Sequence, residues 1–129
     1  MTEKFPAKGY KENVLKDCFN DAKKYFLHHI LNVDRAHLIM LGEQNIISSK
    51  ELNILATAIQ SLNTEAISDA KYDGSVEDLF FFIQREISNA CDDKNTAGKL
   101  HTARSRNDID VTIYRLYLRT QTLELIDSV

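Results

Sequence analysis

Apolar residues recur along this chain at steps of three and four positions, which is the spacing of one face of an α-helix. The first stripe lies within residues 11–44 and comprises Val14, Leu15, Cys18, Phe19, Ala22, Phe26 and Ile30, followed by Val33, Ala36 and residues 38–41. The pattern predicts helix over 11–44 and leaves open whether one bent helix or two cover it. Residues 1–10 read as a polar arm, and residues 45–48 break the rhythm.

Short polar signals mark the starts of the later elements. "SSKE" (Ser48 to Glu51) has the form of a capping box, and helically spaced apolar residues follow it as far as Leu62. Residues 72–74 (Tyr-Asp-Gly) predict a turn. "SVED" (75–78) predicts the start of a helix with acids in its first turn. Its run of three phenylalanines, 80–82, predicts packing on two sides.

The last helix is expected from "SRND" (105–108) onward, after a loop at 91–104. Ile109, Ile113, Leu116, Tyr117, Leu123 and Ile126 recur at helical steps, and neither Gly nor Pro interrupts them. Because this stripe has no stop signal, we expect the chain to end within the element. We also expect residues 109–129 to expose an apolar stripe that drives self-association.

Composition narrows the class to an all-α domain. The 129 residues are 43% hydrophobic and include only four Gly and one Pro, which favours long helices over hairpins. The net charge of −3 argues against a nucleic-acid binder. Cys18 and Cys91 lack metal-type spacing and are expected to be free thiols in a reducing compartment. With no membrane-length apolar run and no signal-peptide pattern, a cytoplasmic protein without membrane contact is expected.

The richest chemistry lies in residues 97–110, "AGKLHTARSRNDID", which we call the polar segment. It leads into a helix N-terminus, whose unpaired amides attract anions. Arg104 and Arg106 add planar donor forks, and Asn107 both donates and accepts. By pattern alone, such a stretch is more often a solvated connection than a site.

A family resemblance changes that interpretation. "GKLHTARSRND" (98–108) resembles the first signature segment of argininosuccinate lyases, in the fumarase/aspartase superfamily, with Ala103 where glycine is more usual. "VDRAHLIML" (33–41), "EDLFFFIQREI" (77–87) and "RLYLR" (115–119) are similar to further family segments. The resemblance covers residues 30–119 well and the first 30 poorly.

The resemblance implies an all-α lyase: an N-terminal helical domain, here 1–104, and the start of a long central bundle helix, here 105–129. It implies a homotetramer that splits a C–N bond by β-elimination and releases fumarate, in arginine biosynthesis. Ser105, Arg106 and Asn107 match the segment that holds the succinyl carboxylates, with Asn107 the first candidate. His101 and Arg104 are further substrate-binding candidates. No metal or cofactor is implied, and the partner is a small-molecule substrate.

Several positions depart from the family pattern. Phe80 stands where many members have His, and Ile109-Asp110 replaces Gln-Val. No N-terminal Ser-containing substrate loop is found in residues 1–20. The family's Thr-x-x-His and Gly-Ser-Ser patterns do not occur in these 129 residues. We therefore expect the chain to supply carboxylate-binding residues and no catalytic ones. A paralogue that acts on another N-substituted aspartate is an alternative.

The remaining polar residues have simpler interpretations. His28 and His29 point about 100° apart on a helix and cannot share a metal. His37 is expected to make a structural hydrogen bond, and His101 either to approach substrate or to anchor its loop. Glu77 and Asp78 read as first-turn acids, with no spacing that supports a salt bridge to the arginines of the polar segment.

Two other classes of protein remain as alternatives. A stand-alone helical interaction module would explain the amphipathic helices equally well. An RNA-binding helix led by "KLHTARSR" is disfavoured by the acidic total and by the lack of interleaved aromatics.

Overall fold

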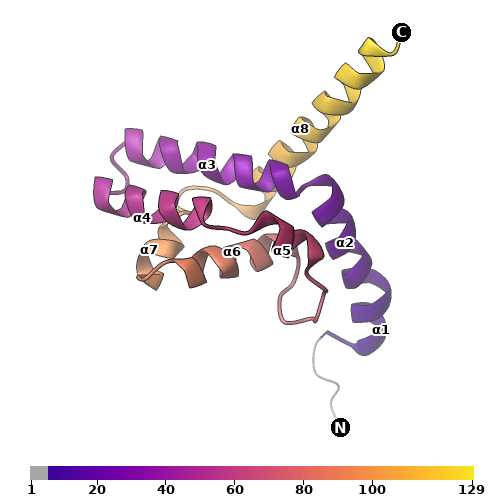
Figure 1. The fold of residues 1–129 in the computed structure, drawn as a ribbon, viewed down its shortest axis with the longest axis horizontal. Coiled ribbons are helices and arrows are strands. Elements are labelled where there is room, and N and C mark those ends of the chain that lie inside the picture. Colours follow the sequence, from indigo (N-terminus) through magenta and orange to yellow (C-terminus); the bar gives the residue numbers. More distant parts are fainter. Residues whose placement is uncertain (1–5) are drawn as a thin grey trace.

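The computed structural model describes residues 6–129, and every regular element within that range is helical (Figure 1). The all-α fold class is therefore confirmed. The elements are α1 (Lys8–Tyr10), the π-helical segment η1 (Lys11–Leu15), α2 (Lys16–Tyr25), α3 (Leu27–Glu43), α4 (Ser49–Gln60), α5 (Thr64–Asp69), α6 (Leu79–Ala90), α7 (Lys94–Lys99) and α8 (Arg106–Asp127).

Two helical runs, rather than one bent helix, cover residues 11–44. α1, η1 and α2 follow one another without a gap, and the break falls at Phe26, whose backbone leaves helical geometry at φ −122°. The expected polar arm is wrong for residues 8–10, which are helical. Residues 1–5 of that arm lie outside the described residues.

The helices α3 and α4 form an antiparallel pair (Figure 1). Asn45 turns the chain between them in the left-handed region, at φ 54°, where Asn is one of the few tolerated residues. The predicted capping box of Ser48 and Glu51 is confirmed, because each side chain bonds to the other residue's backbone amide. Leu55, Ala58 and Ile59 of α4 are buried, so the pair supplies one wall of the core.

The helix α6 begins at Leu79, three residues after the predicted start. Asp78, not Ser75, is the N-cap, since its carboxylate accepts from the amide of Phe81 at 3.1 Å. Residues 75–77 stay outside the helix, where the Ser75 hydroxyl accepts instead from Arg85. The expected turn at 72–74 is present, with Gly74 at φ +79°. α6 packs against α4 and α7 on one side and α2 on another, which agrees with its aromatic run.

The predicted loop at 91–104 is wrong in its middle, where α7 forms. Asp93 caps α7 by accepting from the amide of Asn95, a signal that the sequence interpretation overlooked. Thr96 and Ala97 are buried, so α7 packs as a short wall rather than as a surface connection.

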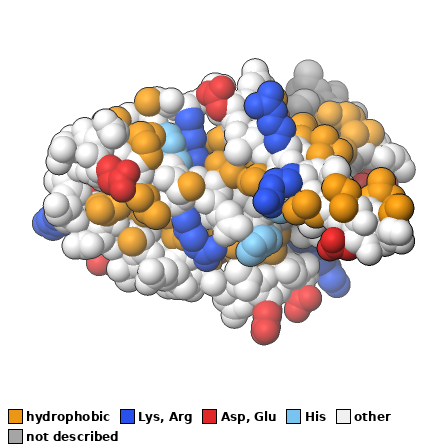
Figure 2. All heavy atoms as spheres, turned by 90° about the horizontal axis from the view of Figure 1, so that it is seen from above, with side chains coloured by type: hydrophobic (Ala, Val, Ile, Leu, Met, Phe, Trp, Pro, Cys, Tyr) orange, Lys and Arg blue, Asp and Glu red, His pale blue; other side chains and the backbone are white. Residues whose placement is uncertain are grey.

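The final helix, α8, and its predicted start at 105–108 are confirmed, and Ser105 and Asp108 form a capping box there. Its first turns bury Ile109 and Ile113 against the body, beside α3. Beyond them α8 projects away from the other helices (Figure 1). The expected exposed stripe is wrong for Ile109 and Ile113, which are buried, and is confirmed farther along, where Leu123 is 45% exposed and Ile126 63%. Leu118 and Leu125, which the predicted stripe did not include, are also exposed, by 62% and 64%. Figure 2 views the molecule from the upper side of Figure 1 and shows apolar patches open to solvent.

No helix among residues 6–129 is both long and apolar enough to cross a bilayer. Cys18 is exposed and Cys91 is buried, and both are free thiols as expected.

Candidate functional site

Within the polar segment, residues 100–105 form a sharp bend between α7 and α8. Leu100 anchors it, fully buried, and Ala103 follows in the left-handed region at φ 62°. Ser105 then starts α8 by accepting from the amide of Asp108. The bend turns the N-terminus of a 22-residue helix, with its unpaired amides, toward solvent at Ser105 and Asn107.

Arg104 points inward, away from that helix end. Its guanidinium forms an ion pair with Asp34 of α3; the Arg104 side chain is 6% exposed and that of Asp34 is fully buried. Gln84 of α6 also donates to the Asp34 carboxylate at 3.2 Å. Burial raises the pKa of Asp34, and the adjacent Arg104 opposes that rise. Arg104 thus joins the polar segment to α3 directly, and to α6 only through the Asp34 carboxylate that Gln84 shares, and it does not face solvent.

Asp34 is the residue of this site that sequence reasoning missed. It lies within the stretch that resembles the family, yet nothing in its spacing pairs it with an arginine 70 positions away. One signal was present: a carboxylate among the apolar residues of α3, since buried charges are rare unless they are paired.

Both histidines near the bend face the protein. His37 donates from Nε2 to the carbonyl of Thr102 at 2.9 Å, which confirms its structural hydrogen bond. His101 packs edge-on against Phe80, with ring centroids 5.1 Å apart, and its Nδ1 accepts from Arg104 at 3.3 Å. Burial lowers the pKa of His101 to about 4, helped by Arg104 and then by His37. His101 is therefore neutral near pH 7, and its contacts with Phe80 and Arg104 anchor the bend to the protein interior.

Arg106 is held by three side chains. It forms ion pairs with Asp78 and with Asp110, the latter at 2.8 Å, and its guanidinium lies 4.4 Å from the centre of the Phe80 ring. A salt bridge between the acids at 77–78 and these arginines was possible from the sequence but unsupported by its spacing, and the structure contains one, between Asp78 and Arg106. Burial raises the pKa of Asp110, and Arg106 opposes the rise.

Ser105 and Asn107 are the exposed members of the predicted set. The Ser105 oxygen accepts within the capping box, which leaves its O–H free to donate. The Asn107 amide makes no side-chain hydrogen bond to any residue in 6–129. The structure therefore presents Asn107 and Ser105 outward and holds Arg104 and Arg106 in ion pairs.

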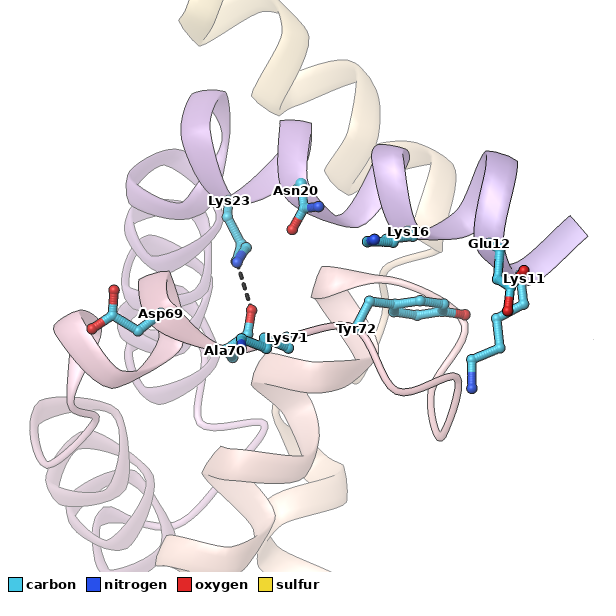
Figure 3. A pocket seen from close by; sticks show the side chains of 9 residues that line it. All are labelled: Lys11, Glu12, Lys16, Asn20, Lys23, Asp69, Ala70, Lys71 and Tyr72. Carbon is cyan, nitrogen blue, oxygen red and sulfur yellow. Dashed lines mark hydrogen bonds between the residues drawn. The ribbon is translucent and has the colours of Figure 1, made fainter. Parts of the chain in front are cut away.

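A hollow of about 550 Å³ lies between the N-terminal helical run and the linker after α5 (Figure 3). Lys11, Lys16, Lys23 and Lys71 make it basic. Lys23 donates to the carbonyls of Ser68 and Ala70, and Lys11 donates to that of Asp73. Two of the four ammonium groups thus attach the linker to the N-terminal helical run. These two lysines of the hollow therefore have a structural role.

No group of three or more potential metal ligands gathers within the described part of the chain. His28 is hydrogen-bonded to Asn32 at 2.9 Å and His29 packs against Tyr117, while the two rings lie edge to face with their centroids 6.0 Å apart.

The fold and the site define a class of all-helical segment. In this class a capped helix N-terminus carries an exposed asparagine, and arginine–aspartate pairs lie beside it, buried or half-buried.

Comparison with known proteins confirms the resemblance to argininosuccinate lyases. The chain is 42% identical over 119 residues to argininosuccinate lyase 2 of Agrobacterium fabrum, covering 92% of this chain and 23% of that protein.

Two further relatives are argininosuccinate lyases. That of Methanococcus maripaludis is 34% identical over 118 residues, covering 90% of this chain and 24% of the relative. That of Clostridium tetani is 32% identical over 124 residues, covering 92% and 28%. No family model matches the chain, and no solved structure matches it. The chain is thus homologous to the N-terminal part of argininosuccinate lyases and spans about a quarter of their length.

Proposed function

We propose that this chain is the N-terminal part of a carbon–nitrogen lyase that converts argininosuccinate to arginine and fumarate, in arginine biosynthesis. In this β-elimination a base removes a proton beside a carboxylate, the C–N bond breaks, and its electron pair leaves with the nitrogen. The resulting double bond completes fumarate. The carbanion intermediate is rich in negative charge, which positioned donors must stabilise.

The observation that carries the proposal is the outward-facing start of α8. Asn107 offers an unengaged amide there, next to the Ser105 hydroxyl and the free N–H groups of the first turn. A helix N-terminus favours a carboxylate through its amides and its dipole. We assign the succinyl carboxylates to Asn107 first, with Ser105 beside it.

Arg106 stays in the proposed site with a narrower role. Because Asp78 and Asp110 already accept from two of the five N–H groups of its guanidinium, Arg106 contacts a substrate carboxylate through the remaining N–H groups or by exchanging one of the two acids. Arg104 and His101, which face the interior, contribute by shaping the bend.

We assign the proton acceptor and donor to parts of the protein beyond this chain. Residues 1–129 alone are therefore expected to release no measurable fumarate from argininosuccinate, because groups that act as a unit give little rate in isolation. The distal part of α8 is proposed to pack against other copies in a homotetramer. We also propose that the protein is cytoplasmic and that it uses no nucleic acid, metal or cofactor.

The test compares two asparagines in the full-length protein. Asn107→Ala should lower kcat/KM for fumarate release at least tenfold, which is about 1.4 kcal/mol and within the range of one charge-assisted hydrogen bond. Asn53→Ala is the matched control, since Asn53 is exposed on α4 and away from the bend. Equal rates for both variants would remove the site assignment.

One observation favours a second candidate, a lyase for another N-substituted aspartate. Two departures from the family pattern, Phe80 and Asp110, both contact Arg106. Fumarate release from a different N-substituted aspartate, with none from argininosuccinate, would select this candidate.

A further inference from the structure

Arg104, whose side chain is buried, leads to a further inference. It rests on the function proposed for the exposed residues Ser105 and Asn107. Ala103 has a left-handed backbone, at φ 62°, although its Cβ makes that conformation unfavourable. Something outside the bend must hold it there.

The contacts on either side of Ala103 both come from α3. His37 bonds to the carbonyl of Thr102, at 2.9 Å, and Asp34 forms the ion pair with Arg104. Asp34 and His37 are three positions apart and so lie on one face of the helix. α3 therefore grips the residue before and the residue after the strained position.

Asp34 is the stronger of these two contacts. It is fully buried, and it is the only carboxylate paired with Arg104 among the residues that the structure describes. The Nε and Nη1 atoms of Arg104 are also buried and make no hydrogen bond there. If Asp34 lost its charge, the buried guanidinium of Arg104 would have no anion beside it. Because an unpaired buried charge is strongly destabilising, the bend would move outward to expose Arg104 to water.

We propose that Asp34 is a positioning residue: through Arg104 it keeps Ala103 left-handed and so fixes the direction in which Ser105 and Asn107 face. Asp34 touches no substrate. Glycine at position 103 would adopt the same backbone without the Cβ penalty, so the need for Asp34 is tied to the alanine.

The test uses the full-length protein and amide hydrogen exchange, which needs no activity. Asp34→Asn should speed exchange in residues 101–108 at least tenfold and leave α4 unchanged. Glu43→Gln is the control, since it removes an exposed acid from the same helix. Equal acceleration in α4 would show general loss of stability and overturn the proposal.

Rescue supplies the second readout. Asp34→Asn should lower kcat/KM at least tenfold, and adding Ala103→Gly should recover at least threefold and slow the exchange of residues 101–108. No recovery in either measurement would overturn the proposal. If Asp34→Asn does not fold, Asp34→Asn with Arg104→Gln removes both buried charges, and the same exchange pattern and the same rescue are expected.

The two hypotheses fail separately. If the unmodified protein releases no fumarate from any N-substituted aspartate, the proposed function is wrong, while the exchange of residues 101–108 still decides the role of Asp34.

Discussion

The helices α4 and α8 begin alike and end differently. Each starts with a serine capping box, and each has apolar residues at helical steps. α4 buries Leu55, Ala58 and Ile59 in the body, whereas α8 buries only Ile109 and Ile113, half-buries Leu116 and Tyr117, and leaves its apolar residues from Leu118 onward exposed. The comparison shows that a local pattern predicts a helix and an apolar face but does not say what covers that face.

The apolar residues of α8 form two stripes. Ile109, Leu116 and Leu123 are seven positions apart and continue the face that packs on the body. Val111, Leu118 and Leu125, also seven apart, lie on the opposite face, since two residues of shift turn a helix by about 200°. A helix that is apolar on two sides needs neighbours on two sides.

The largest expected effect separates the two halves of α8. Ile109→Ala should destabilise the chain by about 2–5 kcal/mol, since it removes a buried side chain from a packed core. Leu118→Ala, at a position 62% exposed, should change stability by less than about 0.5 kcal/mol. Urea unfolding followed by circular dichroism measures both. Similar losses would mean that the distal half is already packed.

The next effect concerns what the distal half does in solution. Leu118→Lys with Leu125→Lys should weaken self-association of residues 1–129 at least tenfold, because charge is placed on the exposed stripe. Asn53→Lys adds charge to exposed α4 and should leave association unchanged. Light scattering across a concentration series gives the result. A monomeric unsubstituted chain at high concentration would contradict the interpretation.

A smaller effect tests whether the two helix starts are equivalent. Ser48→Ala and Ser105→Ala should each cost about 1 kcal/mol, the usual loss for removing a serine cap. Ser49→Ala, one residue inside α4, keeps the cap and serves as the control. Thermal unfolding of the three variants measures the difference. A much larger loss for Ser105→Ala would show that the bend before α8 depends on its cap.

The smallest effect is a pH dependence at the bend. Burial holds the folded pKa of His101 near 4, below its ordinary 6.5, so the unfolded chain binds the additional proton between these values. Stability from this residue is therefore present above about pH 6.5 and is lost as the pH falls toward 4. The melting temperature should drop less between pH 7.5 and 5.5 in His101→Gln than in the unsubstituted chain. Identical drops would mean that His101 is already charged or solvated.

The sequence predicted those features that local chemistry decides. The capping box of α4, the start of α8 at 105–108 and the course of α8 follow from residues within a few positions of each other. α7 was missed because its six residues are too few to show an apolar period, although Asp93 marks its start. α6 was placed too early because Ser75 and Asp78 both suit a cap. In the structure Asp78 accepts from the amide of Phe81, whereas Ser75 accepts from the side chain of Arg85.

The candidate site divides in the same way. Ser105 and Asn107 are exposed because the helix start is exposed, which the sequence indicates. Asp34 with Arg104 and Asp78 with Arg106 join residues 70 and 28 positions apart, and such pairs depend on the packing of α3, α6 and α8 together. Local spacing contains no information on that packing.

The long separation between Asp34 and Arg104 also orders the events of folding. Closing so long a stretch of chain costs entropy before the ion pair can return any stability, whereas the turn between α3 and α4 closes over a few residues. The hairpin of α3 and α4 is therefore expected to form early and to serve as a template. The bend before α8 is expected to form last, when Arg104 pairs with Asp34 on the already folded α3.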